Sequence, residues 1–147
     1  MTYHLTATRD ELAVIVGTLI DGGKRLALVA AHEEPDEFRV VYVFLGGDRV
    51  EVTMTMTRDD AWLPSLASIC YPAGRFEREI RDLYGIRAQD HPLPHRLVRH
   101  AHWPTGYHPM RSGAGPMPVV DTPASYPFLQ VEGDGVYEIP VLSLIHI

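Results

Sequence analysis

The chain has 147 residues, a formal net charge of −6 and a hydrophobic content of 46%. These values predict one globular domain that can bury a full core. The chain contains neither an apolar run of the roughly 18 residues that a membrane span needs nor a basic-then-apolar leader, so we expect neither a membrane helix nor secretion. The single Cys70 excludes a disulfide within the chain and a CxxC metal knuckle, and it fits a reducing cytoplasm.

Charge is distributed unevenly along the chain. Residues 1–60 carry 6 Lys or Arg and 11 Asp or Glu, residues 61–111 carry 7 and 4, and residues 112–147 carry 4 acidic groups and no Lys or Arg. All seven cations of the middle segment are Arg, which pairs with carboxylates at protein interfaces better than Lys does. Because the chain is acidic and has no recognised nucleic-acid motif, it is not expected to bind nucleic acid.

The first half of the chain predicts a helix followed by a sheet. Thr8 and Glu11 fit a capping box, and Gly22 marks the end of the helix. The apolar stripe of this helix consists of Leu12, Ile15, Val16, Leu19 and Ile20. We expect the helix to cover one face of the strands that follow.

Strands are predicted over Arg25–His32, Phe38–Leu45 and Arg49–Thr57. The second is apolar on both faces apart from Arg39, which is typical of an interior strand. The third alternates between apolar and polar residues, which predicts one buried face. A short helix is expected over Pro64–Cys70. The predicted fold class is α+β, with a mostly antiparallel sheet, helices packed on one face, and an extended Pro-rich C-terminal arm after them.

A charge-dense helix is predicted over residues 76–84. Its apolar stripe consists of Phe76, Ile80, Leu83 and Tyr84, at positions i, i+4, i+7 and i+8. Gly85 follows as the left-handed residue that ends the helix. Opposite charges stand four residues apart in the pairs Arg75/Glu79, Glu77/Arg81 and Arg78/Asp82. This pattern predicts ion pairs on exposed faces rather than a general acid/base set.

Prolines are frequent after Gly85, and each removes a backbone donor, so residues 90–130 are expected to form an extended arm that lies on a partner. Five of the eight histidines fall here, namely His91, His95, His100, His102 and His108. Their spacing matches no zinc pattern and no Cys joins them, so we interpret them as hydrogen-bonding and stacking groups. A His-rich, metal- or pH-responsive binding module is the alternative from another class.

The middle of the chain resembles a known family. The resemblance rests on Phe76-Glu77-Arg78-Glu79, Asp82-Leu83-Tyr84-Gly85, His91-Pro92 and His108-Pro109-Met110-Arg111, with Ser65-Leu66, Pro72-Ala73 and Arg96-Leu97 beside them. In order and spacing these residues are similar to the signature of the 30-kDa subunit family of respiratory complex I, the NADH dehydrogenase of the respiratory chain.

Two further segments resemble the hydrogenase branch of this family. Val98-Arg99-His100 with Trp103-Pro104 is similar to the membrane-bound NiFe hydrogenases of the formate-hydrogenlyase type, or group 4. Val131–Val141 resembles the junction at which the large subunit of that branch begins. In that branch the 30-kDa-like domain is fused ahead of the hydrogenase large subunit.

These resemblances predict the domain organisation. Residues 1–111 are expected to form the 30-kDa-like domain, with its core at about 8–85 and its arm at 86–111. Residues 112–141 are expected to link it to a missing large-subunit domain. Residues 142–147 resemble a translated sequencing adapter, so they are expected to be a non-native tail.

The resemblance also implies a function. It implies a non-catalytic scaffold and docking domain of a membrane-associated multisubunit oxidoreductase, formate-hydrogenlyase-like, on the cytoplasmic face of the inner membrane. No catalytic, cofactor-binding or metal-binding residue is expected in this chain; a NiFe centre and iron–sulfur clusters are expected in partner domains or subunits. The alternative is a free-standing 30-kDa-like subunit of NADH:quinone oxidoreductase, which is complex I.

The expected partners are the hydrogenase large-subunit (49-kDa-like) domain and the iron–sulfur small subunit. The docking residues expected on the arm are His91, Pro92, Arg96, Arg99, His108, Pro109 and Arg111. Proline-stiffened backbone lowers the entropic cost of association, and Arg forms paired hydrogen bonds with carboxylates.

Overall fold

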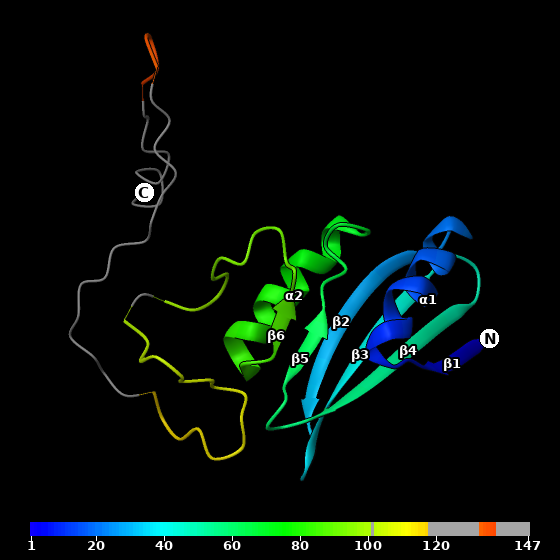
Figure 1. Cartoon of the computed structure of the whole chain (residues 1–147), viewed down its shortest axis with the longest axis horizontal. Helices are drawn as coiled ribbons and strands as arrows, with labels where there is room; N and C mark the ends of the chain where they lie inside the picture. Colours follow the sequence, from blue (N-terminus) through cyan, green and yellow to red (C-terminus); the bar gives the residue numbers. More distant parts are fainter. Residues whose placement is uncertain (101, 118–132, 138–147) are drawn as a thin grey trace, which may run out of the picture.

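The computed structural model describes residues 1–100, 102–117 and 133–137 (Figure 1). The predicted linker 112–141 lies mostly outside these residues, and the predicted tail 142–147 lies wholly outside them. The elements follow the order β1 (Thr2–Thr6), α1 (Arg9–Asp21), β2 (Arg25–Glu33), β3 (Glu37–Leu45), β4 (Arg49–Thr57), β5 (Trp62–Pro64), α2 (Tyr71–Tyr84) and β6 (Arg87–Gln89).

The main sheet has the strand order β1-β4-β3-β2. Strand β3 lies in its interior and pairs antiparallel with both β2 and β4, as its apolar sequence predicts. Strand β1 has no counterpart among the strands predicted from the sequence, and it pairs parallel with β4. The fold is therefore α+β, as predicted, with a sheet that is mixed and mostly antiparallel.

One face of the sheet carries the core. The alternation predicted for β4 is confirmed, because Val50, Val52, Met54 and Met56 are all buried. On β3, Phe38, Val40, Tyr42 and Phe44 are buried beside them. Buried side chains from α1 and α2 join this same cluster, so both helices cover one face of the sheet (Figure 1).

Helix α1 begins and ends as the sequence predicts. The Glu11 carboxylate accepts a hydrogen bond from the backbone N–H of Thr8 at 3.0 Å, which completes the capping box. The side chains of Leu12 and Val16 face the core. At the start of the helix, the guanidinium of Arg9 stacks 4.1 Å from the ring centroid of Trp62, which joins α1 to β5.

The helix predicted over Pro64–Cys70 is wrong. Pro64 ends strand β5, which pairs parallel with β6, and residues 65–70 form an irregular segment with a turn. The backbone N–H of Ser65 donates to the carbonyl of Gln89 at 2.9 Å, and that of Leu66 donates to the Glu77 side chain at 2.7 Å. These partners in β6 and α2 satisfy the two amides and hold the segment in its irregular course.

Helix α2 is longer than predicted and starts at Tyr71, with Cys70 as its N-cap. Pro72 lies in its first turn, where a missing N–H costs nothing. At the other end Gly85 adopts φ 76°, the left-handed conformation predicted for it. In the described part of the chain, neither helix is both long and apolar enough to cross a membrane.

Ile80 tests whether the apolar stripe of α2 belongs to the core. Its side chain is 4% exposed, so we expect Ile80→Ala to lower the free energy of unfolding by about 2–5 kcal/mol, measured by urea denaturation. Val14 on α1 is 70% exposed and supplies the control, because Val14→Ala should change the stability by less than about 0.5 kcal/mol. Equal losses in both variants would contradict the placement of this stripe.

Candidate functional site

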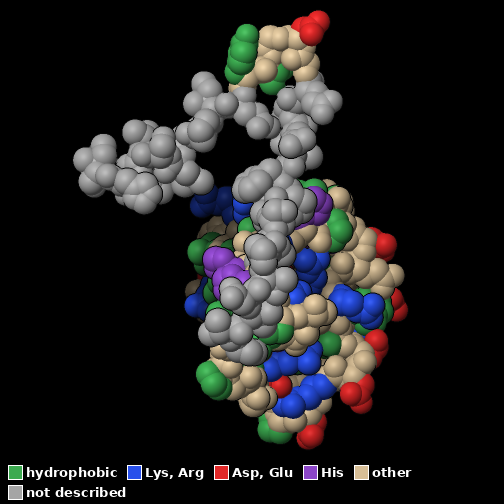
Figure 2. All heavy atoms as spheres, turned by 90° about the vertical axis from the view of Figure 1, so that its left-hand side faces the viewer, with side chains coloured by type: hydrophobic (Ala, Val, Ile, Leu, Met, Phe, Trp, Pro, Cys, Tyr) green, Lys and Arg blue, Asp and Glu red, His purple; other side chains and the backbone are tan. Residues whose placement is uncertain are grey.

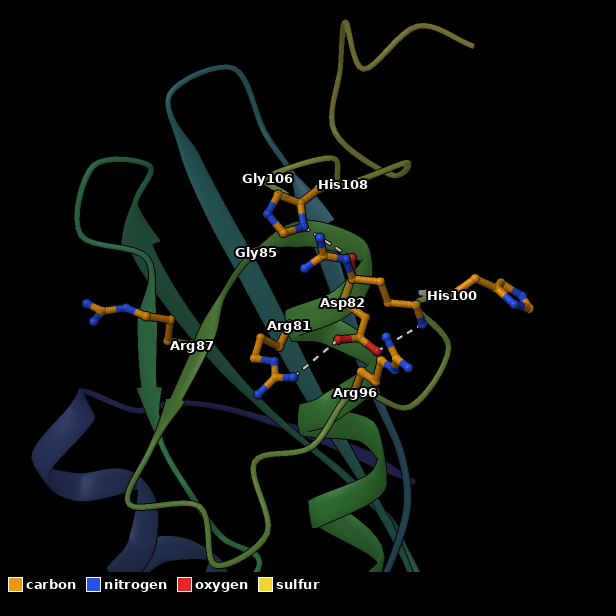
Figure 3. A pocket seen from close by; sticks show the side chains of 9 residues that line it. Arg81, Asp82, Gly85, Arg87, Arg96, His100, Gly106 and His108 are labelled. Atoms are coloured by element: carbon orange, nitrogen blue, oxygen red, sulfur yellow. Dashed lines mark hydrogen bonds and ion pairs between the residues drawn. The ribbon is translucent and has the colours of Figure 1, made fainter. Parts of the chain in front are cut away.

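The arm folds back along its own helix. After β6 ends at Gln89, residues 90–100 and 102–117 contain neither helix nor strand, as the prolines predict. The sequence predicts that the arm lies on a partner, whereas in the structure residues 91–100 and 102–111 lie along α2 of the same chain (Figure 3). The residues of the family signature make most of the contacts between the two.

Asp82 is the centre of this contact. Its side chain is buried, and its Oδ2 accepts hydrogen bonds from three successive backbone amides, those of Leu97 at 2.6 Å, Val98 at 2.9 Å and Arg99 at 3.1 Å. Successive N–H groups that converge on one point form an anion-binding nest. The nest of the arm is therefore occupied by a carboxylate of the helix.

Two arginines of α2 fasten the preceding part of the arm. Nε and Nη2 of Arg78 donate to the carbonyl oxygens of His95 at 2.7 Å and of Arg96 at 2.8 Å. Arg81 donates to the carbonyl oxygen of Pro94 and lies 3.5 Å from the neighbouring Asp82 carboxylate. The three ion pairs predicted at a spacing of four residues are thus wrong. Arg78 and Arg81 bind backbone carbonyls of the arm, and Arg75 donates to the Tyr71 hydroxyl at 3.2 Å.

The C-terminal end of α2 is closed by the last part of the arm. Nδ1 of His108 lies 3.1 Å from the carbonyl oxygen of Asp82. The backbone N–H of Met110 donates to the carbonyl oxygen of Leu83 at 3.2 Å. Nε of Arg111 donates to the carbonyl oxygen of Tyr84 at 2.6 Å. These carbonyls belong to the last turn, which has no partners within the helix. The arm thus acts as a C-cap.

Glu77 is a second buried carboxylate, on the side of α2 that faces residues 65 and 66. Its side chain is 1% exposed. Oε2 accepts from the Ser65 hydroxyl at 2.6 Å, and Oε1 accepts from the Leu66 N–H at 2.7 Å. Burial raises the pKa of Glu77, and this effect outweighs the lowering by Ser65, Leu66 and His91. The pair predicted between Glu77 and Arg81 is replaced by these contacts.

His91 joins the arm to Glu77 and to the helix backbone. Its Nδ1 accepts a hydrogen bond from the N–H of Leu93 at 2.9 Å, so its Nε2 carries the proton and donates to the carbonyl of Gly74 at 3.0 Å. Nε2 also lies 3.8 Å from Oε2 of Glu77. Gly74 permits this approach, since a Cβ there would lie 3.2 Å from the imidazole.

The remaining signature residues support the same interface. Phe76 and Tyr84 are partly buried and pack on the core, and the ring of Tyr84 meets that of Phe38 edge to face at 6.3 Å between centroids. Among the other signature residues, Glu79, Leu83 and Pro109 are partly exposed and Pro92 is exposed. Arg111 also stacks 5.3 Å from the Phe38 ring centroid, so this residue contacts both α2 and β3.

Four of the five arm histidines make hydrogen bonds or ring contacts through their imidazoles, in agreement with their interpretation from the sequence, whereas His95 contacts α2 through its backbone carbonyl. The ring of His100 lies 5.4 Å from that of His102 and 5.7 Å from that of Trp103, centroid to centroid. Within residues 1–100, 102–117 and 133–137, no group of three or more His, Cys, Asp or Glu side chains is arranged to hold a metal ion.

A basic pocket of about 450 Å³ opens where the arm leaves the end of α2 (Figure 3). Its walls come from α2, β6 and the arm, and its lining residues are Arg81, Asp82, Gly85, Arg87, Arg96, Arg99, His100, Gly106 and His108. Figure 2 shows Lys and Arg side chains over the middle of this side of the molecule and acidic side chains mostly at its margin.

The structure divides the predicted docking residues into two groups. Arg96, Arg99 and His108 line the basic pocket, whereas His91 and Arg111 do not. Hydrogen bonds within the chain also hold the side chains of His91, Arg99, His108 and Arg111. Docking by all of them stays a prediction. Arg87 also lines the pocket, although it is not among the docking residues predicted from the sequence. Only its place in the arginine-rich segment 61–111 could have indicated this role.

Gly85 tests the closure of the helix end. A Cβ on Gly85 would lie 2.6 Å from Nε2 of His108 and 2.9 Å from Nη2 of Arg111, whereas a Cβ on Gly23, with a similar φ of 83°, would meet nothing within 4 Å. We expect Gly23→Ala to cost about 1 kcal/mol from backbone strain alone. Gly85→Ala should cost about 1–3 kcal/mol more, because it displaces both capping side chains. If both variants lost the same free energy of unfolding in urea denaturation, His108 and Arg111 would not pack tightly against Gly85.

The raised pKa of Glu77 predicts a pH dependence opposite to that of an ordinary paired carboxylate. Because the folded chain holds this proton more tightly than the unfolded chain, the contribution of Glu77 to stability falls as pH rises from the unfolded pKa toward the folded one. Glu77→Gln keeps an acceptor for Leu66 and removes the titration. Relative to this variant, the wild type should lose stability as pH rises above about 4, the ordinary pKa of Glu. A difference that stays constant as pH rises would contradict the burial effect.

Comparison with known proteins places this geometry in a family. Residues 3–115 match the family described as respiratory-chain NADH dehydrogenase, 30 Kd subunit. The chain is 33% identical over 93 residues to a subunit of NADH-quinone oxidoreductase from Parvibaculum lavamentivorans, and the match spans 61% of this chain and 44% of that protein. It is also 33% identical over 97 residues to hydrogenase-4 component G of Escherichia coli, covering 63% of this chain and 17% of that protein.

A solved structure shows the same fold. The trypsin-resistant fragment 1–134 of Nqo5 superposes with a TM-score of 0.56 at 23% identity, covering 63% of this chain and 82% of the fragment. The chain spans less than half of the length of the curated relatives named above. Since the family match covers most of the chain and includes both α2 and the arm, the chain belongs to the family of the 30-kDa subunit of respiratory-chain NADH dehydrogenase.

Proposed function

We propose that this chain is a non-catalytic scaffold and docking domain of a membrane-associated multisubunit oxidoreductase. The observation that carries the proposal is the arm, which is held along α2 by hydrogen bonds to signature residues and presents an arginine-lined pocket beside them. Its relatives are a subunit of NADH-quinone oxidoreductase and a component of hydrogenase-4. A fixed, charged surface of this kind suits association with another subunit.

The polar groups of the signature support a positioning role. Both carboxylate oxygens of Glu77 and both ring nitrogens of His91 bind groups of the same chain. Asp82 holds three amides of the arm. Electron transfer would then use cofactors in partner domains or subunits, namely a NiFe centre and iron–sulfur clusters in the hydrogenase version of the complex.

The finer proposal assigns the chain to the formate-hydrogenlyase-like branch, as the N-terminal part of a NiFe hydrogenase large subunit. The similarity to hydrogenase-4 component G and the segment Val98-Arg99-His100 support it. Its partners would be the 49-kDa-like large-subunit domain and the iron–sulfur small subunit, at the cytoplasmic face of the inner membrane.

A free-standing subunit of NADH:quinone oxidoreductase is the second candidate. The similarity to a subunit of NADH-quinone oxidoreductase favours it. The two candidates differ in what lies next to the chain in the cell, since one predicts a covalently joined large-subunit domain and the other a separate large subunit.

Purification from the organism that carries the gene tests the proposal. A chromosomally tagged chain should copurify from membranes with a large subunit and an iron–sulfur subunit, identified by mass spectrometry. Hydrogen oxidation by this preparation would assign the hydrogenase branch, and NADH:quinone activity would assign the second candidate. Recovery of the tagged protein without any oxidoreductase subunit would reject both.

Substitution of Arg96 tests the proposal by mutation. Arg96→Ala should reduce the amount of large subunit recovered, because the residue lines the pocket that faces outward. Arg25, exposed at the start of β2, is the control, and Arg25→Ala should leave recovery unchanged. Thermal denaturation of the purified variants separates lost docking from lost folding, since only a docking residue reduces recovery without lowering Tm.

A further inference from the structure

The basic pocket at the end of α2 has the features of a binding site for an anion. Its volume of about 450 Å³ falls within the range of ordinary ligand sites. Four guanidinium groups line it, those of Arg81, Arg87, Arg96 and Arg99, and His100 and His108 stand beside them. Asp82 supplies the single carboxylate among the lining residues, and this group is buried against the arm.

The positive charge of this pocket follows from how its arginines are held. Arg81 and Arg99 donate to backbone carbonyls, those of Pro94 for Arg81 and of Trp103 and Pro104 for Arg99. A carbonyl oxygen fixes the position of a guanidinium without neutralising its charge. Arg87 is exposed, and its side chain has no hydrogen-bond or ion-pair partner within the described residues. Arg81 also lies 3.5 Å from the Asp82 carboxylate, so this one carboxylate stands against four guanidinium groups and the lining keeps an excess of cations.

A small phosphate-like anion fits this arrangement poorly. Phosphate sites in proteins commonly use converging backbone amides, and the three converging amides of the arm are already bound to Asp82. The cationic side chains are also spread apart, since Figure 3 shows Arg87 and His100 pointing away on opposite sides of the pocket. Charge spread over such a distance suits a ligand with several separate anionic groups.

We propose that this pocket binds an acidic segment of a partner protein, through at least two Asp or Glu side chains that pair with Arg87 and with the Arg96 and Arg99 side. Gly106 in its wall adjoins open space, because a Cβ there would meet no atom within 4 Å, so a peptide backbone has room to approach. Arg pairs with carboxylates in a planar, two-bond geometry, which gives both orientation and affinity. This inference rests on the proposed function and names the chemistry of the docking partner.

Titration of the full chain with a hexaglutamate peptide at low ionic strength tests the proposal. Isothermal titration calorimetry should show one peptide per chain, with affinity that falls as salt is added. Hexaglutamine should give no signal. Arg87→Gln should weaken binding about fivefold. Arg25→Gln removes the same charge from an exposed arginine at the start of β2, outside the pocket, and should leave the affinity unchanged.

Two results would overturn the inference. Equal weakening in Arg87→Gln and Arg25→Gln would mean that the peptide responds to overall charge, and displacement of the peptide by inorganic phosphate at an equal concentration would mean a small-anion site. Failure of the two proposals can be told apart. If the chain copurifies with oxidoreductase subunits but does not bind hexaglutamate, the proposed function stands and the inference about the pocket is rejected. If it binds hexaglutamate but does not copurify with these subunits, the pocket inference stands and the proposed function is rejected.

Discussion

Oδ2 of Asp82 holds the arm against the helix through three successive amides, more than any other side-chain atom between the two accepts. Hydrogen bonds to a charged group contribute about 1.5–3 kcal/mol each, and this oxygen accepts three. The net stability of a whole domain is only about 5–15 kcal/mol. The burial of a carboxylate near the C-terminal end of a helix, where the dipole disfavours an anion, is thus offset by the amides of the arm.

The helix and the arm consequently form one structural unit. The arm supplies partners for the carbonyls of Asp82, Leu83 and Tyr84, and the helix supplies the arginines that bind the carbonyls of the arm. Each side satisfies backbone groups of the other that would otherwise face water or stay unpaired. Arg78 binds neutral carbonyls of the arm, and Arg81 shares the Asp82 carboxylate with three amides, so arginines remain in excess over carboxylates where the helix and the arm meet.

Local patterns in the sequence were sufficient for the elements whose period is regular. The alternation of Arg49–Thr57, the capping box of α1 and the left-handed Gly85 all appear as predicted. The short strands β5 and β6 escaped detection, because three residues carry no period and their pairing joins segments far apart in the chain. Prediction of the site failed for a similar reason. Glu77 and Asp82 look like surface charges in a helical pattern. They become buried acceptors only through segments outside the helix, Ser65 and Leu66 for Glu77 and the returning arm for Asp82.

The distance in sequence between Asp82 and its amides has a consequence for how the protein is made. A ribosome releases α2 before it releases residues 97–99 and the capping residues His108 and Arg111. Until those residues emerge, the carboxylate of Asp82 lacks its nest, and the last carbonyls of the helix lack the donors of the arm. The sheet from β1 to β4 can be complete while α2 is still unfinished. Synthesis of residues 91–111 is therefore the step that commits the signature helix to its place on the sheet.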